Sequence, residues 1–189
     1  MANKVKFGLS NCYYAPITDI TGGVYSYGTP VAIPGAVNLS LSASGDTNDF
    51  YADNIIYFTS TANQGYEGDL EIAMIPDTFR TAILGETIDL NGALVENATD
   101  TNTGFAFGFQ IEGDKANRRF WYYNCSVTRP ANNGATTEAS ITPQTDTLTM
   151  KAMPRSGDKA VRVFIEKSDD NTAAYNGFFS AVYEKSISA

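Results

Sequence analysis

Histidine is absent from the 189 residues of this sequence. Histidine supplies the base of most nucleophile triads, many zinc ligands and the usual proton shuttle near neutral pH. Its absence therefore excludes Ser-His-Asp and Cys-His catalysis and His-ligated zinc. The acid–base chemistry that stays open is the kind that two carboxyl groups perform in glycosidases.

Cysteine is scarce as well, with only Cys12 and Cys125, which form no CxxC motif. The residues from Met1 to Lys6 lack the apolar stretch of a secretory signal. We therefore expect two free thiols and a reduced, cytoplasmic setting. No apolar run approaches the ~20 residues that span a bilayer, so we expect a soluble protein without a membrane partner.

Basic residues are outnumbered, because 13 Lys and Arg face 21 Asp and Glu for a formal net charge of −8. Nucleic-acid binding needs clustered Lys and Arg to displace counterions from phosphates. Here Arg118 and Arg119 form the only adjacent basic pair. The composition argues against stable nucleic-acid binding and favours a subunit that stays soluble before it assembles.

Alternation of apolar and polar residues is the dominant pattern of the sequence. Such a period of two is typical of strands that lay one face on a core. Turn residues such as Pro34-Gly35 and Asn133-Gly134 separate the alternating segments. The pattern predicts a mainly antiparallel β-sandwich or barrel. The predicted strands are residues 37–43, 68–74, 105–111, 119–127, 147–153 and 160–165.

One short flanking helix is predicted over residues 76–85. Asp77 is suited to cap its N-terminus, Phe79 and Ile83 share a face, and Gly85 suits the position just past its end. A second, weaker helical turn is predicted near residues 173–180. We expect one domain over residues 1–189, with an N-terminal arm to about residue 11 and a C-terminal extension from about residue 168.

Carboxylates are the first candidates for chemistry. Glu67, Asp69 and Glu71 form the densest group, and Asp69 and Glu71 point the same way if they lie on a strand. A solvated strand face explains this group better than a catalytic pair, because neither an obvious base nor a substrate-binding aromatic lies beside it. We predict no catalytic residue, no cofactor and no metal.

Two other groups of residues are candidates for binding sites. Asp46, Asp49 and Asp53, like Asp169-Asp170-Asn171, supply oxygen ligands for calcium, but the spacing fails the EF-hand pattern, so polar loops are favoured. Trp121 is the only tryptophan and could stack on a sugar, although packing in a core or an interface is favoured. A carbohydrate- or calcium-binding β-sandwich module therefore stays open as an alternative.

Several segments, in order along the chain, resemble the major tail protein family of siphophages that infect Gram-positive bacteria. The resemblance covers most of residues 3–154 and is weaker after Arg155, where residues 174–179 (AYNGFF) are its best remnant. The other segments are residues 27–36 (YGTPVAIPGA), 50–54 (FYADN), 65–72 (GYEGDLEI), 123–130 (YNCSVTRP), 134–138 (GATTE) and 143–149 (PQTDTLT).

The resemblance implies a non-enzymatic virion protein with the tail-tube β-sandwich fold. Its copies would form hexameric rings that stack into the tail tube, after assembly in the bacterial host cytoplasm. The tube would enclose the tape measure protein and conduct DNA without binding it stably. The tail terminator and the distal tail or baseplate proteins are further implied partners. Two other functions stay open as hypotheses: a decoration protein of the phage head and, more remotely, a glycosidase.

The contact residues are an inference from the sequence. Residues 44–54 lie between two predicted strands and contain the adjacent aromatic residues Phe50 and Tyr51. Two adjacent aromatic residues are not expected in a loop whose only contact is with solvent. We expect these two side chains, together with Asp46, Asp49 and Asp53, to lie in a subunit or ring interface. Glu67, Asp69 and Glu71 are candidates to line the lumen, with the outside of the tube as the alternative.

The absence of histidine leads to a prediction about pH. Assembly and stability should change little between about pH 6 and 8, because no side chain with an unperturbed pKa in that window is present. Thermal melting and light scattering at pH 6, 7 and 8 would measure this. A steep change within the window would contradict it.

Overall fold

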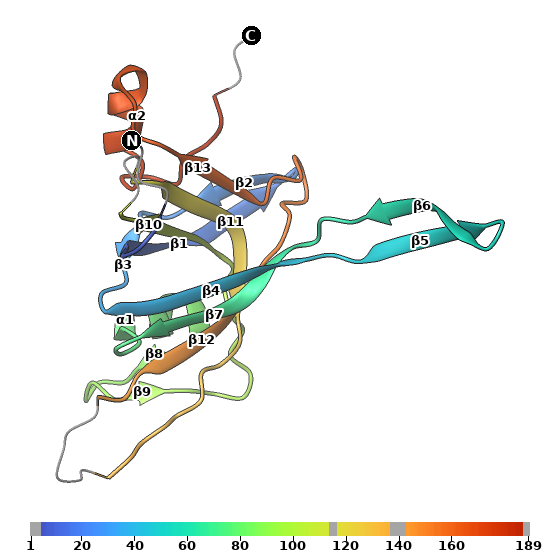
Figure 1. The fold of residues 1–189 in the computed structure, drawn as a ribbon. Coiled ribbons are helices and arrows are strands. Elements are labelled where there is room, and N and C mark those ends of the chain that lie inside the picture. Colours follow the sequence, from blue (N-terminus) through green and yellow to red (C-terminus); the bar gives the residue numbers. More distant parts are fainter. Residues whose placement is uncertain (1–4, 114–116, 137–142, 187–189) are drawn as a thin grey trace.

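Antiparallel strands are the main regular secondary structure of the protein (Figure 1), whose computed structural model describes residues 5–113, 117–136 and 143–186. The strands are β1 (Leu9–Thr21), β2 (Val24–Tyr27), β3 (Val31–Ala32), β4 (Ala36–Ser44), β5 (Thr47–Ala52), β6 (Ile55–Thr61), β7 (Gly65–Ile72), β8 (Thr87–Ile88), β9 (Leu94–Val95), β10 (Phe105–Ile111), β11 (Arg119–Val127), β12 (Asp146–Ala152) and β13 (Arg162–Ile165). The helical elements are α1 (Asp77–Phe79), the π-helical η1 (Arg80–Leu84), the 3-10 turn η2 (Asp169–Asn171) and α2 (Thr172–Asn176).

One large sheet runs in the order β2-β1-β10-β11-β12-β7-β4, with β3 beside β1 and β13 beside β11. Strand β11 changes partner along its length. Its first half, from Arg119 to Tyr122, pairs with β13, and its last three residues pair with β12. The sheet therefore bends at β11, so that β1, β10 and β11 face β4, β7 and β12 like the two layers of a sandwich (Figure 1).

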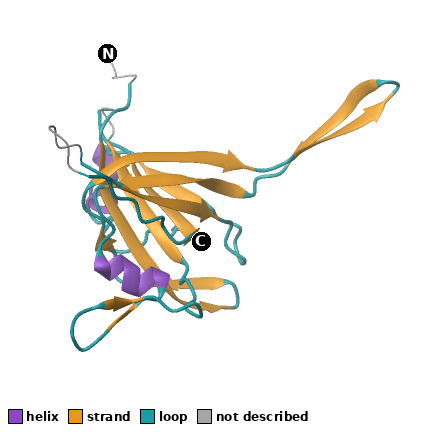
Figure 2. Ribbon diagram, turned by 90° about the horizontal axis from the view of Figure 1, so that it is seen from below, coloured by secondary structure: helices purple, strands orange, loops and turns teal. Residues whose placement is uncertain are grey.

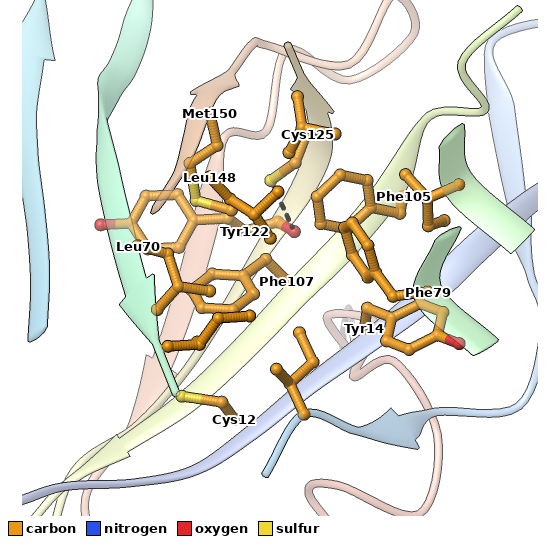
Figure 3. Close-up of a cluster of buried hydrophobic side chains, with 14 of the residues drawn as sticks. Cys12, Tyr14, Leu70, Phe79, Phe105, Phe107, Tyr122, Cys125, Leu148 and Met150 are labelled. Carbon is orange, nitrogen blue, oxygen red and sulfur yellow. Dashed lines mark hydrogen bonds between the residues drawn. The ribbon is translucent and has the colours of Figure 1, made fainter. Parts of the chain in front are cut away.

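The main core lies between these two layers (Figure 3). Phe105, Phe107 and Phe109 alternate along β10 and all point into it, as the period-two pattern predicts. Phe79 joins them from the helix, with ring centroids 5.6 Å from Phe105 and 5.0 Å from Tyr14. The opposite layer contributes Leu70, Ile72, Leu148 and Met150.

The other face of β10 and β11 is buried as well, in a second core that the C-terminal residues 172–185 cover. Gly108 lies opposite Trp121, and a Cβ atom on Gly108 would come within 2.9 Å of the indole ring. The indole N–H donates to the carbonyl of Phe178 at 2.8 Å. On the same face of β11, Arg119 donates to the carbonyl of Tyr175 and the Tyr123 hydroxyl to that of Tyr183.

An ion-pair cluster secures the end of this C-terminal segment. The Arg155 guanidinium is nearly buried and makes two hydrogen bonds to Asp158, of 3.0 and 2.6 Å, and one of 2.6 Å to Glu184. Because Arg155 donates to it, the pKa of the Asp158 carboxyl lies well below its usual range. Lys185 adds a second cation 3.4 Å from Asp158.

The predicted helix is present as the continuous α1 and η1, and Phe79 and Ile83 are buried on its core side. Gly85 ends it in the left-handed conformation, as predicted. The capping prediction was wrong. Pro76 occupies the N-cap position and Asp77 is the first helical residue, without a side-chain cap hydrogen bond. Proline provides the extended φ and ψ needed just before the helix.

The mainly antiparallel β fold is confirmed, and each predicted strand overlaps an observed one. The second predicted helical turn corresponds to α2. Sequence periodicity missed β1, β2, β3, β5, β6, β8 and β9. No helix in the described residues is long and apolar enough to cross a membrane.

Phe178 tests how firmly the C-terminal segment is held. Replacing this fully buried ring by alanine should cost about 3–5 kcal/mol of unfolding free energy, the usual range for a buried Phe. Urea unfolding would measure the loss, and a red shift of Trp121 emission in the native variant would locate it. Phe164→Ala is the matched control, because that ring is 50% exposed. Equal losses in the two variants would contradict this account.

Candidate functional site: a hairpin arm and a polar sheet face

The paired strands β4 and β7 continue beyond the body of the protein into a hairpin arm, residues 45–64, that contains β5 and β6 (Figures 1 and 2). A backbone hydrogen bond from Gln64 to Ser44, at 2.9 Å, joins the arm to the sheet, and one from Ala62 to Asp46, at 3.0 Å, closes the base of the arm. The two backbone segments approach so closely here that a Cβ atom on Gly45 would lie 1.8 Å from the Ala62 carbonyl oxygen. Glycine is therefore required at this junction.

A two-residue turn closes the tip of the arm. Asp53 and Asn54 both have positive φ, of 52° and 62°, which is the type I′ geometry that suits the twist of a hairpin. The interpretation of residues 44–54 as a loop was therefore wrong. Phe50 and Tyr51 lie on strand β5, where Phe50 pairs with Phe58 and Tyr51 with Ile56.

The arm exposes an unusual amount of apolar surface. Both faces carry apolar side chains, because Phe50 and Phe58 form one cross-strand pair and Tyr51 and Ile56 the next. Strands β5 and β6 pair only with each other. Six large side chains on the arm are between 53% and 71% exposed: Phe50, Tyr51, Ile55, Ile56, Tyr57 and Phe58.

An isolated two-stranded hairpin is marginally stable at best in water. Apolar patches of this kind on a soluble protein mark surfaces that another molecule covers. Burying each of these side chains would stabilise a complex by roughly 1.5–3 kcal/mol before the costs of association. The arm is therefore the strongest candidate interface on this chain.

The sequence prediction covered only two of these six side chains. It singled out Phe50 and Tyr51 but not β6, because Ile55 to Phe58 form a continuous apolar run rather than an alternating one. The signal was present in the turn, since two apolar runs separated by Asp53 and Asn54 indicate a hairpin.

Asp46, Asp49 and Asp53 are strung along the arm rather than gathered around a point. Strand β5 separates Asp46 from Asp53, which amounts to roughly 20 Å of extended chain. Asp49 accepts a 2.7 Å hydrogen bond from the Thr59 hydroxyl on the neighbouring strand. Within the described residues, no group of three or more Cys, Asp or Glu side chains is placed to hold a metal ion.

The outer face of β4, β7 and β12 is a grid of nine polar side chains. Glu71, Asp69 and Glu67 form its central column on β7. Strand β4 supplies an amide or hydroxyl opposite each acid, and β12 supplies two hydroxyls and one ammonium group. The three rows of the grid are Asn38–Glu71–Thr147, Ser40–Asp69–Thr149 and Ser42–Glu67–Lys151.

Each of the three carboxylates of this polar grid contacts a hydroxyl or ammonium group on or beside β12. Thr149 donates to Asp69 at 2.7 Å and Thr145 donates to Glu71 at 2.7 Å. Lys151 lies 3.9 Å from Glu67. The grid is a hydrated, net acidic surface without an apolar side chain, so it offers no aromatic platform for a sugar.

Trp121 is the other candidate sugar platform, and its side chain is fully buried in the second core. A cavity of about 530 Å³ lies by the β1–β2 turn, lined by Gly23, Tyr25, Arg155, Asp158 and Glu184 among others. The charged groups on its wall already pair with one another. The cavity therefore presents no unpaired charge from that cluster to a ligand.

The chain matches no known protein-family model and no curated protein. What can be concluded about function therefore rests on the arm, the grid and the residues that resemble the tail protein family.

The two cysteines should be inert in the folded protein. Both are buried, and burial raises the pKa of each thiol to about 12. At pH 8 the thiolate fraction at such a pKa is on the order of 10⁻⁴. We therefore expect no rapid reaction with a thiol reagent until urea unfolds the chain, when two equivalents should react. Rapid labelling of the native protein would contradict this.

Proposed function

We propose that this protein is the subunit of a phage tail tube, a non-enzymatic virion protein whose copies assemble into stacked hexameric rings. The observation that carries the proposal is the hairpin arm. Its apolar side chains are exposed on both faces and lie outside the body of the protein, as expected of a surface that another molecule covers, and we assign that place to a second copy.

The form of the contact supports a polymer. An arm that leaves the body on one side meets a different surface on its neighbour, which makes the contact heterologous. Heterologous contacts close into rings or continue as open helical assemblies. In this proposal Phe50 and Tyr51 have the interface role that the sequence predicted, and β6 supplies the other four of the six exposed large side chains of the arm.

The polar grid fits the lumen of such a tube. A conduit for DNA needs a wetted surface that repels phosphates, and Glu67, Asp69 and Glu71 provide one carboxylate in each row. Neighbouring hydroxyls keep two of the carboxylates hydrogen-bonded. Two of the three strands of the grid, β4 and β7, continue into the arm, so assembly through the arm would align the grids of successive copies.

The double variant Phe50→Ala plus Tyr51→Ala tests the proposal. It removes two exposed aromatic rings, so folding should be unaffected while the concentration needed for tube formation rises at least tenfold. Negative-stain electron microscopy and sedimentation across concentration and salt would measure assembly.

Val24→Ala is the matched control, because Val24 is 71% exposed but lies on β2, away from the arm. It should assemble like the unmodified protein. Tubes that form normally with the double variant would show that these two rings are not the anchor. Glycan or calcium binding by protein that never assembles would favour a binding module instead.

A further inference from the structure

Strand β13 is a free edge of the large sheet. It pairs with β11 on one side, and the described residues provide no strand on its other side. Its side chains alternate, so that Val163 and Ile165 pack in the second core while Arg162 and Phe164 are exposed. Phe164 is 50% exposed, and its ring lies 5.7 Å from that of Phe120. The strand therefore offers both unpaired backbone groups and an aromatic side chain.

The same stretch is basic. Lys159, Arg162 and Lys167 are exposed, and Glu166 is the only acid between residues 159 and 167. Glu166 is already occupied by Arg118, with 2.5 Å between Nε and the carboxylate oxygen. None of the ion pairs among described residues involves Lys159, Arg162 or Lys167. Arg162 is engaged within its own copy, since it donates to the Tyr122 hydroxyl at 3.4 Å and lies 4.8 Å from the centre of the Tyr66 ring. The ammonium groups of Lys159 and Lys167 are therefore the charges that this stretch offers to a partner.

The hairpin arm has the opposite charge and the same apolar character. Residues 45–64 contain Asp46, Asp49 and Asp53 and no Lys or Arg. We propose that residues 159–167 receive the hairpin arm of a second copy. This inference rests on the proposed function, because it names the surface that the arm covers during assembly.

Backbone pairing and charge act together in this contact. The outer edges of β5 and β6 are unpaired, so either strand can add to the free edge of β13 as peptides add to sheet edges. Phe164 then meets the aromatic side chains of the arm. The three Asp residues approach Lys159 and Lys167, which steers the encounter and sets its register. The arm points away from its own body, so the contact forms between copies (Figure 1).

A second exposed apolar surface competes for the role of receptor. It comprises Met74, Ile88, Leu90 and Val95, on and around the β8–β9 hairpin. Residues 74–100 contain five acids and one basic residue, Arg80, which is paired with Glu86. Arg129 from outside this range pairs with Glu96, so an excess of acids remains. An arm with three Asp residues would be repelled there. Charge therefore selects β13 over the more apolar surface.

Reciprocal charge reversal tests the contact. Asp46→Lys with Asp49→Lys reverses the arm, and Lys159→Asp with Lys167→Glu reverses the receptor. Each pair of substitutions alone should raise the concentration needed for assembly at least tenfold. An equal mixture of the two variants should assemble again, because the arm of each variant then meets a receptor of opposite charge on the other. Phe164→Ser should impair assembly, whereas Leu90→Ser, the matched change on the competing surface, should not.

A photo-crosslinking residue in place of Tyr51 locates the contact independently of tube formation. Crosslinked peptides from residues 159–167 of another copy, lost in the receptor reversal, would support the inference. Tubes with crosslinks only to residues 74–95 would overturn it while leaving the proposed function intact. An absence of both tubes and intermolecular crosslinks at millimolar concentration would overturn both. Impaired assembly in Leu90→Ser but not in Phe164→Ser would also overturn the β13 contact.

Discussion

Burial of both faces of β10 and β11 is the constraint on which the rest of the structure depends. The main core on one face holds the helix and the opposite layer of the sheet, while the second core on the other face holds the C-terminal segment. Gly108 makes the second core possible by leaving room for the Trp121 ring. With both faces of this strand pair covered, the sheet bends at β11 and turns β12, β7 and β4 toward the main core.

Stability is distributed unevenly as a consequence. The body is held by aromatic packing, by side-chain hydrogen bonds to the carbonyls of residues 175, 178 and 183, and by the Arg155 cluster. The arm is held by one two-stranded ladder and exposes the apolar groups that would ordinarily support it. Regions with few buried contacts are the ones that open or reorganise most easily. Such a division suits a subunit that folds alone and completes its structure on assembly.

The charged side chains are also arranged differently in the body and in the exposed arm and grid. In the body the Arg155 cluster pairs acids with bases, whereas the arm and the polar grid keep an excess of carboxylates. In the proposed assembly, this excess of carboxylates would make copies repel one another at most orientations, and the basic, apolar surface of residues 159–167 would attract the arm. The excess acid that opposes nucleic-acid binding thereby also restricts which surfaces of the subunit associate.

The sequence by itself determined the β class, six of the strands and the helix from residue 76 to residue 85, because period-two burial and the Gly85 terminus are local properties. It also identified Phe50, Tyr51 and the acids of β7. Only the tertiary structure decided that Phe50 and Tyr51 lie on a strand and that β6 adds four more exposed apolar side chains beside them. It also decided that Glu67, Asp69 and Glu71 lie between polar side chains of two neighbouring strands. Strand pairing brings together residues far apart in the sequence, such as Asp69 and Thr149, which are 80 positions apart, and Leu9 and Ile111, which are farther apart still. No local pattern encodes such a partnership.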